Sequence, residues 1–201
     1  MKPLLAFSRI IDAVNQWVGS IIIWFVLAAV LVSAGNAVVR KVFNVSSNAY
    51  LEVQWYLFSA VFLLCAGYVL LRNEHVRIDV IIGQLSRRKQ IWIDIFGLVV
   101  FLLPAAVLIA WLSWPLLVRA YVSGEMSQNA GGLVRWPVFA LIPLGFGLLV
   151  LQAISELIKR VAFLQGLIDD PTLKKQRKSA EEELAEAMRA EAEAMREATR
   201  K

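Results

Sequence analysis

The side chains best suited to acid–base chemistry stand at the two ends of one apolar stretch. Glu52 precedes an uncharged run from 53 to 71, and His75, Arg77 and Asp79 follow that run. A carboxylate and a histidine can exchange a proton near neutral pH when they share one site. A helix of about 23 residues, however, separates Glu52 from His75 by roughly 35 Å. We therefore expect two separate polar ends and no shared proton or substrate path between them.

Residue types that build cofactor sites and catalytic centres are sparse in this chain. His75 is the only histidine, so a haem held between two imidazoles is excluded, and no nearby residues have the spacing of metal ligands. Cys65 is the only cysteine and is expected to pack as a small apolar side chain. The sequence also lacks a phosphate-binding loop, a dinucleotide fingerprint and a nucleophile paired with a base. We predict no enzyme activity, no cofactor and no bound metal.

Long apolar segments must position these polar residues. Apolar residues make up 59% of the chain and its mean hydropathy is +0.63, which is typical of a membrane protein. Four charge-free windows are each long enough to cross a bilayer as a helix, and their continuous apolar character excludes barrel strands. We predict an all-α integral membrane protein with a four-helix membrane domain over 17–160. Its spans are expected at about 17–39, 51–71, 92–118 and 137–158.

Two amphipathic segments are expected to lie along the membrane interface. The first is 1–16, in which four apolar residues recur at helical spacing: Leu4, Phe7, Ile11 and Val14. The second follows His75, with Asp79 placed to cap its start and with apolar residues along one side: Ile78, Ile81, Ile82 and Leu85. The first apolar run is much longer than a signal-peptide core, so we expect it to remain in the protein as a span.

The composition changes at Asp169, where the apolar pattern ends. Residues 169–201 are rich in Ala, Glu, Arg and Met, and they place opposite charges three or four positions apart. The apolar stripe of this tail is too thin and too short for a stable coiled coil. We predict that the tail is a charged, soluble C-terminal helix.

The distribution of basic residues predicts how the spans are oriented. With the N-terminus inside, most Lys and Arg residues fall in cytoplasmic segments, and the outside loops contain only Arg40, Lys41, Arg119 and Arg135. This arrangement follows the positive-inside rule and places both termini in the cytoplasm. Glu52 and the loop 119–135 then face outside. The net charge of +5 reflects this topology, and we expect no binding of nucleic acid.

Several polar residues inside or beside the spans have structural explanations. Glu52 is expected in the first turn of the second span, where the helix dipole favours a carboxylate. Asp94 is expected to cap a helix or to form an ion pair. Gln152 and Glu156 are expected to face protein instead of lipid. Pro104 is expected to kink the third span.

Polar, aromatic and glycine residues around the second span resemble a known family. In chain order they are Arg40, Asn44, Tyr50-Leu51-Glu52, Trp55-Tyr56, Gly67 and Arg72-Asn73-Glu74-His75-Val76-Arg77-Ile78-Asp79. Over about residues 10–160, this order is similar to the small membrane subunit, of the DctQ type, of tripartite ATP-independent periplasmic (TRAP) transporters. Two later segments are similar to the branch whose binding proteins take monocarboxylates such as 2-oxo acids: Asn129-Ala130-Gly131-Gly132 and Arg135-Trp136-Pro137.

The resemblance implies a non-catalytic, multi-pass protein of the bacterial inner membrane that acts in sodium-coupled secondary transport of carboxylates. One implied partner is a large multi-span permease subunit, which carries substrate and sodium and forms a heterodimer with the small subunit. The other is a periplasmic substrate-binding protein that docks on the outside face. The small subunit would widen the static scaffold of the large one.

The charge distribution and the resemblance agree on the topology, and together they suggest roles for charged residues on each side of the membrane. Four residues are expected near the binding-protein dock: Arg40, Glu52, Glu125 and Arg135. Three are expected to form a structural hinge that turns the chain into the interface: His75, Arg77 and Asp79. Two other classes stay open. One is a membrane adaptor that recruits a cytoplasmic partner through its C-terminal helix, and the other is a membrane anchor for a redox enzyme, against which the single histidine counts.

Overall fold

The computed structural model describes residues 1–44, 47–73, 85–168 and 188. The chain divides into two units, Met1–Asp169 and Asp170–Lys201, and every helix named below belongs to the first unit. The predicted C-terminal tail lies outside the described residues, apart from Met188. Most of the interfacial helix predicted after His75 also lies outside them, so both segments stay predictions.

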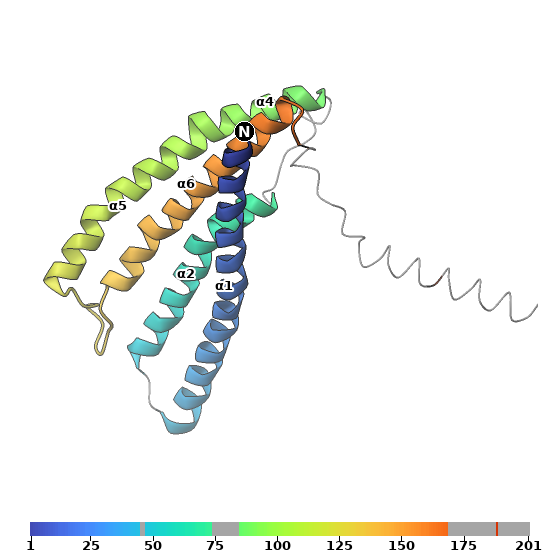
Figure 1. Cartoon of the computed structure of the whole chain (residues 1–201). Helices are drawn as coiled ribbons and strands as arrows, with labels where there is room; N and C mark the ends of the chain where they lie inside the picture. Colours follow the sequence, from blue (N-terminus) through green and yellow to red (C-terminus); the bar gives the residue numbers. More distant parts are fainter. Residues whose placement is uncertain (45–46, 74–84, 169–187, 189–201) are drawn as a thin grey trace, which may run out of the picture. The chain divides into compact units, whose positions relative to one another are not determined.

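Helices form almost all of the described part of the first unit (Figure 1). In chain order they are α1 (Lys2–Phe43), α2 (Asn48–Arg72), α4 (Arg87–Gly97), the π-helical turn η1 (Leu98–Leu102), α5 (Leu103–Ser123) and α6 (Trp136–Leu164). Within the described ranges there is no strand, only an antiparallel bridge between Met126 and Val134. Four helical stretches in these ranges are long and apolar enough to cross a membrane. The predicted all-α fold with four membrane-spanning helices is confirmed.

Proline, serine and asparagine residues mark where the helices begin and end. Pro3 and Pro137 stand in the first turns of α1 and α6, where a missing N–H breaks no helical hydrogen bond. Ser47 caps α2, because its hydroxyl oxygen accepts a hydrogen bond from the Ala49 backbone N–H at 3.3 Å. Asn44 and Asn73 end α1 and α2 in the left-handed conformation.

The third span contains a π turn directly before its proline. α4, η1 and α5 follow one another without a break, so that Arg87–Ser123 forms one stretch of 37 residues. Pro104 donates no backbone hydrogen bond, and its ring crowds the preceding turn of a regular α-helix. The wider turn at Leu98–Leu102 gives that ring room. Pro104, which is expected to kink the third span, is therefore accommodated by a π turn.

Residues 1–16 are the first turns of α1 and not a separate helix. The helix runs unbroken over Lys2–Phe43, which is roughly 63 Å at 1.5 Å per residue. Ser8 and Asn15 are buried, whereas Val14 is exposed. The polar side of this segment thus faces protein. The boundary predicted after residue 16 therefore lies inside one continuous helix. Polar contacts hold the first turns of this helix against α6.

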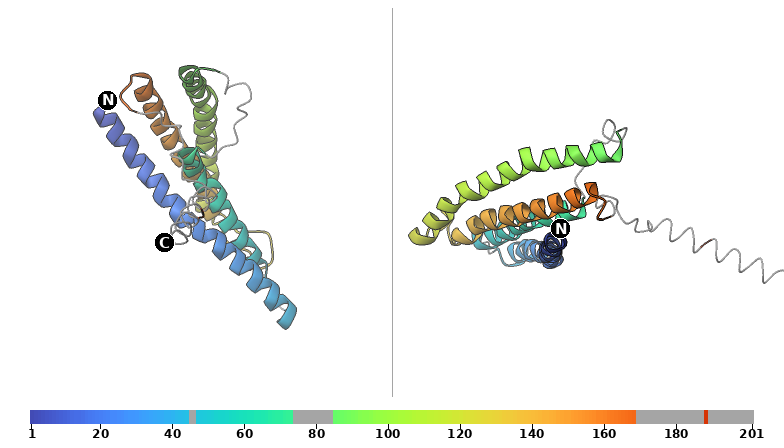
Figure 2. Two further views of the ribbon diagram at one scale, coloured as in Figure 1. Left: turned by 90° about the vertical axis from the view of Figure 1, so that its right-hand side faces the viewer. Right: turned by 45° about the horizontal axis from the view of Figure 1, so that its top comes forward.

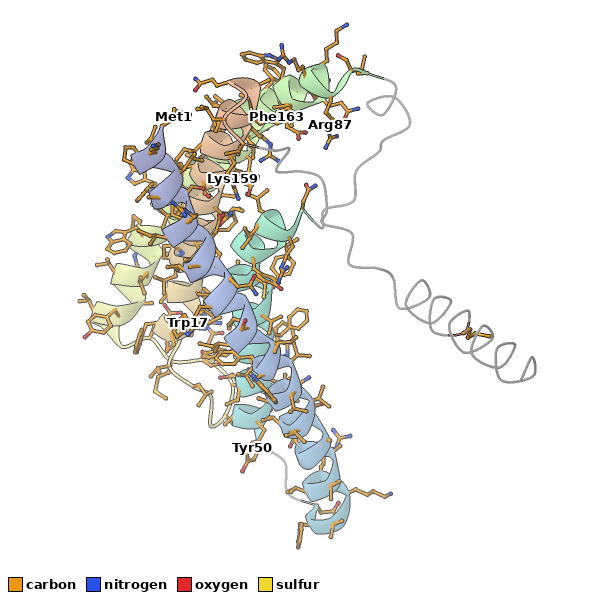
Figure 3. All side chains as sticks on the ribbon, turned by 45° about the vertical axis from the view of Figure 1, so that its right-hand side comes forward. Met1, Trp17, Tyr50, Arg87, Lys159 and Phe163 are labelled. Carbon is orange, nitrogen blue, oxygen red and sulfur yellow. The ribbon has the colours of Figure 1, made fainter. Side chains whose placement is uncertain are left out.

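The helices lie side by side in the order α1, α2, α6 and α5 (Figures 1 and 2), and α1 also contacts α6. Gly145 of α6 lies against the backbone of α2, where an added Cβ would stand 2.5 Å from the Leu63 carbonyl oxygen. A residue without a side chain therefore allows the two helices to approach closely. Large apolar side chains such as Trp17 project away from the helix bundle (Figure 3), as expected of helices that face lipid.

Candidate functional site

Glu52 holds the loop between α5 and α6, at the end of the helices predicted to face outside. The Leu133 backbone N–H donates to Glu52 Oε2 at 2.6 Å, and the Asn129 side-chain amide donates to Glu52 Oε1 at 2.9 Å. Beside them, the Tyr56 hydroxyl donates to the Val134 carbonyl oxygen at 2.8 Å. Hydrogen bonds to an ionised carboxylate are stronger than neutral ones. The loop is thus fixed to α2 through one acidic side chain and one phenol.

The loop folds back on itself and needs glycine to do so. Its two sides meet at the bridge between Met126 and Val134. Gly131 has a φ of 71°, a backbone conformation that residues other than glycine rarely adopt. At Gly132 an added Cβ would stand 3.0 Å from Glu52 Oε1, so a larger residue would push the loop away from the carboxylate. The Gly-Gly pair lets the loop close on Glu52.

A half-exposed ion pair lies at the base of the loop. Arg135 Nη1 is 2.9 Å from Glu125 Oε1, and the two side chains are 41% and 40% exposed. Arg135 and Glu52 also line a cavity of about 700 Å³ between α2, the loop and the start of α6, with Trp55 on its wall. Acidic and basic groups held in a fixed arrangement can select a protein partner by charge complementarity.

The structure brings together three of the four residues predicted near a dock. Glu52, Glu125 and Arg135 surround one loop. Arg40 lies exposed in the last turn of α1, and in the described part of the chain it forms no hydrogen bond or ion pair with the other three. The first turn of α2 contains no acidic residue, so the expected position of Glu52 in that turn is wrong. Its carboxylate binds the loop instead.

The predicted hinge residues His75, Arg77 and Asp79 lie outside the described residues. The described residues before this segment end at Asn73, which terminates α2 with a φ of 52°. The hinge stays a prediction.

A second polar cluster joins α1 to α6, at the opposite end of the helices from Tyr50 (Figure 3). Asp12 is its centre. Its carboxylate accepts hydrogen bonds from Ser155 Oγ at 2.7 Å, from Gln152 Nε2 at 2.9 Å and from Lys159 Nζ at 3.0 Å. Asn15 Nδ2 donates to Gln152 Oε1 at 2.9 Å. Since the Gln152 side chain is fully buried, these bonds satisfy polar groups that would otherwise be unpaired.

Charged residues extend this cluster to α4. Glu156 is 4% exposed and forms ion pairs with Lys159, at 2.5 Å, and with Arg160. Arg160 Nε lies 3.5 Å from Asp94 Oδ2. Because a buried charge is costly unless it is paired, each of these side chains depends on its neighbours. Of the two explanations expected for Asp94, a helix cap or an ion pair, the structure shows the ion pair, and Gln152 and Glu156 face protein as predicted.

The α1 half of this cluster was not expected from the sequence. Ser8, Asp12 and Asn15 are four and three positions apart, a spacing that puts them on one face of a helix. The matching face of α6 carries polar residues at similar spacing: Gln152, Ser155, Glu156 and Lys159. Complementary polar stripes on two helices indicate that the helices pack against each other. The stripe on α1, however, also fits the interfacial helix predicted over 1–16.

Neither polar cluster has the composition of a metal site. Among the residues that the structure describes, no group of three or more His, Cys, Asp or Glu side chains could hold a metal ion. The groups around Asp12 bind one another, and those around Glu52 bind a loop. Both arrangements position helices and loops.

Four apolar helices, with a polar cluster between α1 and α6 and an ordered loop at one end, define a small multi-pass membrane protein. A family model described as the DctQ component of tripartite ATP-independent periplasmic transporters matches residues 29–163. The chain belongs to this family, the small permease subunits of TRAP transporters, and the resemblance seen in the sequence is confirmed. The matched region includes Glu52 and Glu156 but begins after Asp12. No curated protein and no solved structure matches the chain.

Proposed function

We propose that the protein is the small permease subunit of a sodium-coupled, binding-protein-dependent transporter of organic acids. The family match over 29–163 carries this proposal, because it covers most of the membrane domain. In this assignment the large permease subunit binds substrate and sodium, and the present chain forms a heterodimer with it in the bacterial inner membrane. Both termini face the cytoplasm, in keeping with the distribution of Lys and Arg.

The pairing of the buried polar groups supports a scaffold role for this chain. Asp12 accepts hydrogen bonds from three side chains, and Glu156 pairs with two cations. A transport path needs polar groups that can exchange partners with a substrate or an ion. The three bonds of Asp12 cross from α6 to α1 and act as ties between these helices, whereas both ion pairs of Glu156 lie within α6.

The loop 124–135 is proposed to help dock the periplasmic binding protein. Because Glu52 fixes the loop, Glu125 and Arg135 are held in one arrangement and remain partly exposed. Charges at the rim of an interface mainly guide association and orientation. Arg40, on α1, is proposed as a separate part of the same dock.

Exchanging the two charges of the ion pair tests this docking role. The double variant Glu125→Arg, Arg135→Glu keeps an ion pair inside the loop but reverses the charges that a partner meets. In proteoliposomes that contain both permease subunits, we expect half-maximal uptake to need about tenfold more loaded binding protein. Arg119→Glu is the matched control, since Arg119 is exposed on α5 and does not line the cavity. Wild-type behaviour of the double variant would contradict the docking role.

A further inference from the structure

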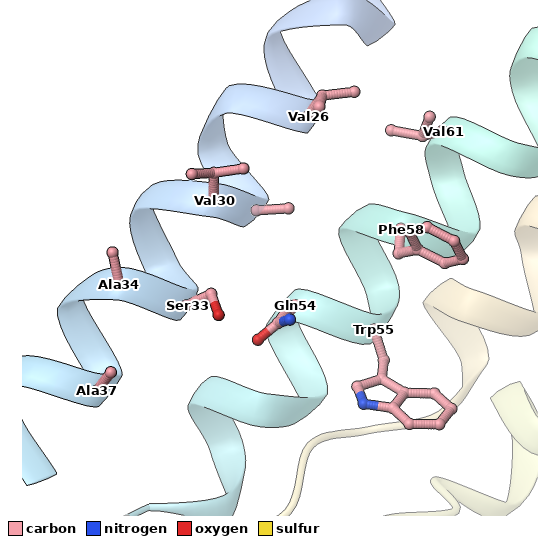
Figure 4. A pocket seen from close by; sticks show the side chains of 10 residues that line it. Val26, Val30, Ser33, Ala34, Ala37, Gln54, Trp55, Phe58 and Val61 are labelled. Carbon is pink, nitrogen blue, oxygen red and sulfur yellow. The ribbon is translucent and has the colours of Figure 1, made fainter.

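An apolar groove separates α1 from α2 over part of their predicted spans. Its volume is about 800 Å³ (Figure 4). The α1 wall consists largely of small side chains, among them Ala29, Ala34 and Ala37. The α2 wall carries Trp55 and Phe58, which are 74% and 68% exposed. The groove therefore combines a wall that permits close approach with a wall of large aromatic rings.

Polar side chains in and beside this groove lack hydrogen-bond partners. Ser33 of α1 and Gln54 of α2 point into the space between the helices (Figure 4), and neither forms a hydrogen bond within the described part of the chain. Asn36, one turn beyond Ser33, has a buried Oδ1 that accepts no hydrogen bond there either. All three lie inside the predicted spans 17–39 and 51–71. Lipid chains offer neither donors nor acceptors, so polar groups at this depth need a protein partner.

We propose that this groove binds a transmembrane helix of the large permease subunit, one that carries at least one polar side chain. Helices associate in membranes through small residues that allow close contact and through hydrogen bonds from Ser, Asn and Gln side chains. A lipid chain could fill the apolar space but would leave Ser33, Asn36 and Gln54 unpaired. The inference rests on the proposed function, because it takes the large subunit as the partner and adds the surface that receives it.

Photo-crosslinking in the intact complex tests the groove directly. The full chain is co-expressed with the large subunit of its transporter and purified through a tag on that large subunit. A photo-reactive amino acid at position 34, which is exposed in the groove, is expected to crosslink to the large subunit. The same group at position 105, an exposed alanine on α5 outside the groove, is expected to give no such crosslink.

Substitutions that fill the groove or remove its polar group give a second readout. Ala34→Trp is expected to lower the amount of this chain retained by the large subunit at least about fivefold, because the added ring occupies the space for the partner helix. Gln54→Leu removes the hydrogen-bonding group and is expected to lower retention roughly threefold. Ala105→Trp adds the same ring to the exposed face of α5 and should leave retention unchanged.

The outcomes separate the groove from the assignment of the subunit. If the wild-type chain does not co-purify with the large subunit, the proposed function fails. If it does, a crosslink from position 34 only to lipid or to a second copy of this chain overturns the groove inference alone. Equal retention of the two Trp variants overturns it as well.

Discussion

Glu52 shows how one charged side chain can order a loop from a neighbouring helix. Both of its carboxylate oxygens accept hydrogen bonds from the loop between α5 and α6, at 2.6 Å from Leu133 and 2.9 Å from Asn129. A carboxylate occupied in this way has less capacity for a partner than the half-exposed pair of Glu125 and Arg135. At the scale of single residues, Glu52 therefore positions the proposed dock, and the other two residues present their charges.

The variant Glu52→Ala removes the acceptor of the Leu133 amide. We expect hydrogen exchange at that amide to become several-fold faster in the purified protein, because its protection then depends only on the loop itself. Glu125→Ala is the control, since it breaks the half-exposed ion pair and leaves the bond to Glu52 in place. Unchanged protection of Leu133 in Glu52→Ala would show that the loop is held by other contacts.

The sequence indicated which residues belong to the site around Glu52, but it did not indicate which atoms these residues contact. The charged side chains Glu52, Glu125 and Arg135 could be selected because they lie in the segments predicted to face outside, where a binding protein would dock. The main donor to Glu52 is the backbone N–H of Leu133, and no side-chain type announces a backbone donor. Contacts of this kind depend on how the loop folds, which sequence spacing alone does not specify.

At the scale of helices, the crossing of α1, α2 and α6 depends on Gly67. An added Cβ at this position would collide with Asn15 Oδ1 and stand 3.2 Å from the Leu148 carbonyl oxygen. Asn15 cannot turn away freely, because its amide donates to Gln152 of α6. A single missing side chain on α2 thus leaves room for the polar tie between α1 and α6.

Gly67→Ala is expected to destabilise the protein by about 1–3 kcal/mol, the usual effect of overpacking a well-packed site. The measurement is unfolding of the purified protein in detergent. Gly147→Ala is the matched control on α6, because nothing lies within 4 Å of an added Cβ there and no overpacking is expected. Equal stability of the two variants would mean that Asn15 yields without loss.

The positions of the helices were easier to predict than the face of each helix that packs against protein. A long apolar run is a property of the chain itself, and for this reason four spans could be expected from hydropathy. The first turns of α1 were harder, because Ser8 and Asp12 have the same periodicity in an interfacial helix and in a helix with a buried polar face. Only the partner stripe on α6 distinguishes the two cases. The π turn before Pro104 likewise depends on how the chain accommodates the ring.

At the scale of the whole molecule, the chain combines internal ties with surfaces that have no partner of their own. The cluster around Asp12 joins α1 to α6, and the loop at Glu52 joins α2 to the region between α5 and α6. The groove between α1 and α2 leaves Ser33 and Gln54 without hydrogen bonds in the described residues. These features fit a subunit that folds as a rigid support and completes its contacts in a larger transporter.

Uptake by a reconstituted transporter tests whether this chain is a permease subunit. Proteoliposomes are prepared with the large permease subunit and supplied with loaded binding protein and a sodium gradient, with and without the present chain. We expect sodium-dependent uptake of an organic acid only when this chain is present. Equal uptake in its absence would contradict the assignment as an essential permease subunit.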